Sequence, residues 1–118
     1  MATIGLTPNT DLLLNNLVQT FGFKEARDAA LFAFAYAVRN KLGVQEELMK
    51  YGIKTKWGTS TFQDINYKMI IDICCPQYQI SEDDSLKLFE GLIHVGIHAL
   101  SRKMDENPKL RISDLLSE

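Results

Sequence analysis

The chain has 118 residues, of which 46% are hydrophobic and 24% are charged, and its formal net charge is −2 at pH 7. This length predicts one domain, and the composition is that of an ordinary globular protein, which excludes a disordered chain. The weakly acidic balance excludes a protein whose whole surface binds nucleic acid, but it leaves room for a local basic patch.

The beginning of the chain predicts a strand and then a helix. Apolar residues alternate with small or polar ones over positions 2–7, which is the period of a strand. Pro8 ends this strand, and Asn9 or Thr10 is expected to cap a helix that runs to about Thr20.

A run of ten apolar residues at 29–38 is the most distinctive segment. Gly22 and Gly43 bracket it, and its alanines favour a helix over about residues 24–42. A helix that is apolar all round must be covered on every side, and this one is too short to cross a bilayer. We therefore expect a second copy of the chain to supply part of the cover. The residues assigned to this oligomer interface are Leu31, Phe32, Phe34, Tyr36 and Val38.

Residues 43–60 predict a loop or arm, in which a turn or two of helix precedes an alternating stretch at 53–57. A third helix is expected over about residues 62–75, where Pro76 stops it. Its buried seam is expected to contain Phe62, Ile65, Met69 and Ile73, extended by Ile70 and Cys74.

The Ser-Glu-Asp-Asp sequence at 81–84 is the clearest helix start, because serine caps a helix and acids suit its N-terminus. The helix is expected to run to about Met104. Gly91 and Gly96 would let another backbone approach it closely. Residues 107–118 predict a short final helix or a flexible tail.

These elements predict a mainly α fold, a single compact helical domain of four to five helices over 1–118 with residues 1–8 as an N-terminal strand. The order of strand, helix, turn and helix is also that of a ribbon–helix–helix protomer, in which two copies pair their first strands. The start of the chain has no basic, apolar signal pattern, and the adjacent Cys74 and Cys75 are poorly placed for a disulfide. We expect a cytoplasmic chain with reduced thiols.

Few residues point to catalysis. Glu90, His94 and His98 share one helical face at a spacing that can place two imidazoles near a metal. The pair lacks the glutamate of a zincin motif, and neither cysteine has an evident base. We expect packing residues, with no metal, no cofactor and no enzyme; a metal-dependent enzyme that uses the two histidines is a further alternative.

Charge is unevenly distributed, with four lysines against one aspartate over 50–68 and four acids against one lysine over 81–90. Patches of opposite sign suit self-association or docking on a charged partner. DNA is a second candidate partner, because lysine supplies charge and tryptophan can stack on a base. The candidate nucleic-acid-binding residues are Lys24, Arg27, Lys50, Lys54, Lys56, Trp57 and Lys68.

A Phe-Lys-Glu sequence that begins at Phe23 precedes the alanine- and phenylalanine-rich helix. The pattern continues further along the chain with Trp57 and Phe62, with Ile70-Ile71 and with Leu88-Phe89-Glu90-Gly91. In this pattern, over about residues 10–104, the chain resembles small proteins encoded beside bacterial DNA-phosphorothioation (Dnd) and related anti-phage defence genes. It departs from them at Leu92-Ile93-His94-Val95, where the family usually has a polar turn that contains asparagine.

The resemblance implies an accessory subunit of a larger ATPase or nuclease, with no catalytic residues to carry over. We therefore expect a bacterial, non-enzymatic accessory or adaptor protein that self-associates, docks on such a partner and does not contact a membrane. A DNA-binding regulator of the ribbon–helix–helix type is the alternative function.

Overall fold

The computed structural model describes residues 3–49, 52–76 and 82–116. It confirms the mainly α fold: within these ranges five α-helices and two short 3-10 helices accompany one two-stranded sheet. In chain order the elements are β1 (Thr3–Leu6), α1 (Pro8–Phe21), α2 (Ala26–Arg39), η1 (Glu46–Met49), β2 (Lys54–Gly58), η2 (Thr59–Phe62), α3 (Tyr67–Cys74), α4 (Glu82–Glu106) and α5 (Ile112–Leu116).

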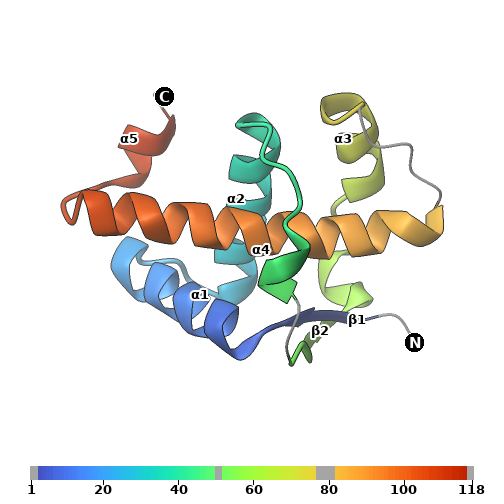
Figure 1. Cartoon of the computed structure of the whole chain (residues 1–118), viewed down its shortest axis with the longest axis horizontal. Helices are drawn as coiled ribbons and strands as arrows, with labels where there is room; N and C mark the ends of the chain where they lie inside the picture. Colours follow the sequence, from blue (N-terminus) through green and yellow to red (C-terminus); the bar gives the residue numbers. More distant parts are fainter. Residues whose placement is uncertain (1–2, 50–51, 77–81, 117–118) are drawn as a thin grey trace.

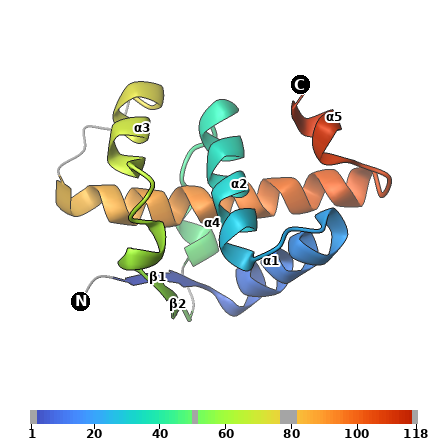
Figure 2. The same cartoon turned by 180° about the vertical axis from the view of Figure 1, so that it is seen from behind.

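Helix α4 is the centre of the molecule. Figure 1 shows α1 and the sheet on one side of it and α3 and α5 on the other, and Figure 2 shows α2 crossing it from one side to the other. Residues 91–97 of α4 are all buried. Within this chain, the helix whose middle is enclosed on every side is therefore α4.

Helix α2 is less enclosed than its sequence predicts. Phe34 is buried, but Leu31 and Phe32 are half-buried and Ala35 is exposed. This chain alone therefore does not cover α2 on every side, and the expected cover from a second copy stays a prediction. The close approach expected at Gly96 is confirmed, since a Cβ there would lie 2.1 Å from the carbonyl oxygen of Ala33.

The N-cap of α1 lies two residues before Asn9, the earlier of the two caps we expect. Thr7 is the N-cap, with its Oγ1 accepting a hydrogen bond from the backbone N–H of Thr10 at 3.2 Å, and Pro8 occupies the first turn. Asn9 and Thr10 are therefore residues of the helix. Gly22 ends it in the left-handed conformation, with φ of 72°, which favours glycine.

The expected N-terminal strand forms, and it pairs with β2 of the same chain in antiparallel register, with Ile4 opposite Trp57. The arm expected over 43–60 therefore contains η1 and the second strand. A ribbon–helix–helix dimer would require β1 to pair with β1 of a second copy, whereas the strand that pairs with β1 here is β2 of the same chain.

Helix α3 is shorter than expected, and it buries a different face. A 3-10 turn occupies Thr59–Phe62, and the α-helix begins only at Tyr67, where Asn66 Oδ1 caps the N–H of Met69 at 3.1 Å. Ile71 is fully buried, whereas Met69 and Ile73 of the expected seam are exposed. The assignment of those two residues to the core is wrong.

The C-terminal residues are partly docked, because α5 buries Leu115 against the rest of the molecule. A wholly flexible tail over 107–118 is therefore excluded for the described part of that segment. The expected serine cap at Ser81 lies outside the described residues, as do the side chains at 82–84. Among the described helices, none combines the length and apolar character needed to cross a membrane.

Candidate binding surface

The face of α4 that carries two histidines is joined to the N-terminal segment by hydrogen bonds. Glu90 Oε2 accepts from the backbone N–H of Gly5 at 2.9 Å. His94 Nε2 accepts from the N–H of Thr7 at 3.4 Å, and its Nδ1 lies 2.8 Å from the backbone oxygen of Glu90. Because that carbonyl can only accept, Nδ1 carries the proton and His94 is neutral.

One turn further along α4, His98 continues this pattern. Its Nε2 lies 2.9 Å from Thr10 Oγ1, which in turn accepts a hydrogen bond from the Thr7 hydroxyl at 2.7 Å. The Thr10 hydroxyl thus links the Thr7 side chain to the His98 ring. We call these six residues the polar seam: Glu90, His94 and His98 of α4, and Gly5, Thr7 and Thr10 of the N-terminal segment.

Burial disfavours the charged form of both histidines. Burial lowers the pKa of His94, whose side chain is fully enclosed, although its bond to the Glu90 backbone works in the opposite direction. Burial also lowers the pKa of His98, with smaller effects from His94 and Arg102. Among the described residues, no three His, Cys, Asp or Glu side chains are placed to hold a metal. The seam thus gives the expected histidine pair a structural role.

The cysteines differ from each other in exposure. Cys74 is exposed at the end of α3, whereas Cys75 is buried. Burial and the neighbouring Cys74 raise the pKa of Cys75, which disfavours the reactive thiolate.

Several of the candidate nucleic-acid-binding residues make contacts within the chain. Arg27 pairs with Asp64, donates from Nε to the backbone oxygen of Thr61 at 2.8 Å, and lies over the ring of Phe62. Its hydrogen bond with Asp64 raises the pKa of Arg27 and lowers that of the Asp64 carboxyl. Arg27 therefore ties α2 to the segment after η2.

The other basic candidates lie on separate elements. Lys56 of β2 pairs with Asp11 at 2.7 Å, and Lys68 of α3 pairs with Asp72 at 2.9 Å. Lys24, before α2, and Lys54, on β2, are exposed. Lys50 lies outside the described residues.

The expected oligomer interface lies largely inside the chain's own core. Phe34 packs edge-on against Phe89, with the ring centroids 4.7 Å apart, and Tyr36 and Val38 are buried. Leu31 and Phe32 are half-buried. Only these two of the five assigned residues leave appreciable surface for a second copy of the chain.

An aromatic cluster connects the sheet to α3. Trp57 of β2 is half-buried and packs on Phe62, which packs on Phe89 of α4, with centroid separations of 5.4 and 5.2 Å. Tyr67 of α3 stacks flat on Phe89 at 4.4 Å. The expected nucleic-acid contact at Trp57 thus competes with a packing role, and α3 is anchored through its first residue.

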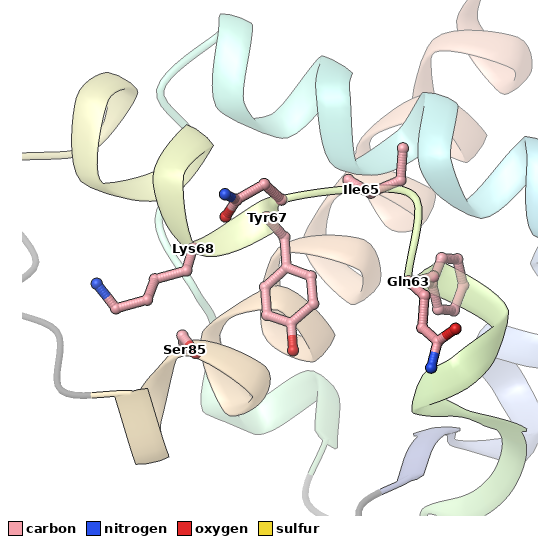
Figure 3. Close-up of a pocket in the computed structure, with 7 residues that line it drawn as sticks. Gln63, Ile65, Tyr67, Lys68 and Ser85 are labelled. Atoms are coloured by element: carbon pink, nitrogen blue, oxygen red, sulfur yellow. The ribbon is translucent and has the colours of Figure 1, made fainter.

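A pocket of about 450 Å³ lies beside this cluster, between the segment from η2 to α3 and the first turns of α4. In Figure 3 the Tyr67 ring projects between Gln63 on one side and Lys68 and Ser85 on the other. Lys68 also belongs to α3, so the pocket continues onto the surface of that helix.

The outward face of α3 exposes two large apolar side chains that the sequence analysis placed in the core. Met69 is 52% exposed and Ile73, one helical turn later, is 70% exposed. Sequence reasoning missed this face because α3 carries apolar residues on two sides of the Lys68–Asp72 pair, and periodicity does not say which side is buried. The ion pair itself marks the boundary of the exposed face.

Compared with protein-family models, curated proteins and solved structures, the chain gives no match. The functional proposal for this chain therefore depends on the geometry of these surfaces and on the resemblance in its sequence.

Proposed function

We propose that this chain is a non-enzymatic adaptor that docks on a larger protein through the α3 face, which we define as Met69 and Ile73. The observation that carries the proposal is the exposure of two large apolar side chains one turn apart on the same helix. Neighbouring exposed apolar groups of this kind are typical of protein interaction sites, where burial removes them from water.

The α3 face is held in place before any partner binds. Ile71 on the opposite side is fully buried, Tyr67 stacks on Phe89, and Asn66 caps the first turn. A helix that is already ordered loses little conformational entropy on binding, which favours the complex. Such a helix suits recognition through apolar anchors at positions i and i+4.

Polar groups border the α3 face. Lys68 and Asp72 form an exposed ion pair on the same helix, and Lys68 also lines the pocket. An apolar centre with a polar rim is the usual composition of a protein–protein interface. The structural use of His94 and Arg27 supports an adaptor over an enzyme, because both side chains already have partners within the fold.

The resemblance to proteins of bacterial anti-phage defence clusters supplies the class of partner. We infer that the partner is the larger ATPase or nuclease of such a system, and that the adaptor works beside it in the bacterial cytoplasm. No ligand or catalytic group of this chain is required for that role.

The test is co-purification from the native bacterium with three tagged forms of the chain. These are the wild type, the double variant Met69→Asp/Ile73→Asp, and the control Leu12→Asp, which changes an apolar residue of α1 that is 59% exposed. Wild type and control should retain one larger protein in fixed ratio, and the double variant should lose it. Equal retention by all three forms, or by none, would contradict the proposal.

Self-association through α2 is a separate part of the proposal, and it must use Leu31, Phe32 and the exposed Ala35. Light scattering at micromolar concentration should then give a mass above that of one chain, and Phe32→Lys should reduce it to one chain. A monomeric wild type would remove self-association and leave the docking proposal intact.

A further inference from the structure

The polar seam takes no direct part in docking, but it holds the N-terminal segment against α4 through hydrogen bonds, one of which requires a neutral histidine. We propose that the polar seam is a proton-sensitive latch, in which protonation of His94 releases Thr7, at the junction of β1 and α1, and so loosens the attachment of β1 to α4. Because β1 supports the aromatic cluster under α3, its release would also loosen the α3 face; that second consequence rests on the proposed function.

The geometry of His94 makes the latch sensitive to one proton. Its Nε2 accepts from the N–H of Thr7, and its Nδ1–H donates to the backbone oxygen of Glu90. An imidazolium has N–H donors on both nitrogens, so the protonated ring would turn a donor toward another donor. A buried positive charge and an unpaired amide would then face each other, which destabilises the closed arrangement.

The surroundings offer little to stabilise a charged His94. Its own helix carries Glu90, whose carboxylate already binds the Gly5 amide, and His98, with Arg102 near His98. The N-terminal segment presents the threonines of the seam, and α2 crosses nearby at Ala33.

On the η1 side, Glu47 shares a pocket of about 210 Å³ with His98. His94 is not among the residues that line this pocket. Burial lowers the pKa of His94, in agreement with a closed state that favours the neutral ring.

Release of β1 would destabilise the position of α3 through the aromatic side chains that lie between them. Ile4 of β1 lies opposite Trp57 of β2, and the rings of Trp57 and Phe62 pack edge-on. Phe62 and Tyr67 both pack on Phe89. Loss of the first strand therefore removes a neighbour of Trp57 and weakens the support beneath the first residue of α3.

The test is amide hydrogen exchange of Gly5 and Thr7 at about pH 7.5 and pH 5.5, corrected for the intrinsic pH dependence of exchange. In the wild type, protection of both amides should fall by about tenfold or more at the lower pH, whereas amides of α4 should change less. The variant His94→Gln keeps an acceptor but does not titrate, so its protection should be the same at both pH values. His98→Gln should retain the fall.

An NMR titration of the wild-type His94 ring gives a second readout that does not depend on a variant folding. The midpoint of the ring's titration should coincide with the midpoint of the loss of Thr7 protection. Constant protection across this range, or an equal fall in His94→Gln, would overturn the latch. These outcomes are independent of partner binding, so the latch and the docking proposal can fail separately.

Discussion

Helices α4 and α3 are both rich in apolar residues, but they relate to solvent in opposite ways. Residues 91–97 of α4 are buried without interruption, and even His94 among them is enclosed and hydrogen-bonded. Helix α3 buries Ile71 and turns Met69 and Ile73 outward. The difference indicates that α4 holds the fold together, while α3 leaves part of its apolar surface exposed, where we propose that a partner docks.

The largest expected effect is on the α4 side of this comparison. Phe89→Ala removes the ring on which Phe34, Phe62 and Tyr67 all pack. The free energy of unfolding should fall by about 4 kcal/mol, as for other large-to-small changes at buried aromatic residues. Urea unfolding measures this, and a loss below about 1 kcal/mol would show that α4 is not the centre of the core.

A smaller loss is expected where α4 and α2 cross. Gly96→Ala would place a methyl group against the Ala33 carbonyl oxygen, so the helices must separate. The free energy of unfolding should fall by about 2 to 3 kcal/mol, typical of overpacking. The control Lys87→Ala, at an exposed position of the same helix, should leave it nearly unchanged. Equal effects of the two changes would contradict the close crossing.

Stability should also depend on pH through His94. Because its pKa in the folded state is lowered, the unfolded state binds more protons as the pH falls. The contribution of neutral His94 to the free energy of unfolding is fully present above the pKa of histidine in the unfolded state, about 6.5. It is lost as the pH falls through the lower pKa of His94 in the folded state. The free energy of unfolding should therefore decrease from pH 7 to pH 5.5, and His94→Gln should flatten that slope. A rise in stability over the same interval would contradict the neutral seam.

The smallest effect belongs to α3. Met69→Asp and Ile73→Asp change exposed side chains, so each should alter the free energy of unfolding by about 0.5 kcal/mol or less. Thermal unfolding measures the change. A loss of several kcal/mol would mean that these residues serve the core, and the docking proposal would lose its basis.

The sequence predicts much of this fold because several of its signals are local. Gly22 ends α1, the alanine-rich run forms α2, and Gly96 permits a close crossing. The cap at Thr7, which our expectation of Asn9 or Thr10 missed, also has a local signal, because a threonine followed by proline satisfies the rules for a helix start.

The remaining features depend on contacts that are distant in the sequence. The pairing of β1 with β2 joins residues about fifty positions apart, and no local pattern specifies it. The face that α3 exposes is decided by the position of Phe89, on which Tyr67 stacks. The spacing of His94 and His98 could be recognised in the sequence because it is local. Their hydrogen-bond partners Thr7 and Thr10 could not, because they are distant in the sequence.

Oxidation of Met69 tests the central claim most directly. Dilute hydrogen peroxide converts exposed methionine to its sulfoxide, and mass spectrometry measures the rate at each site. In the isolated chain Met69 should be oxidised readily. In the complex with the co-purified partner the oxidation rate of Met69 should fall about tenfold. The half-buried Met104 of α4 is the control, and its oxidation rate should be the same in the free chain and in the complex. Equal oxidation of Met69 in the free chain and in the complex would contradict docking through the α3 face.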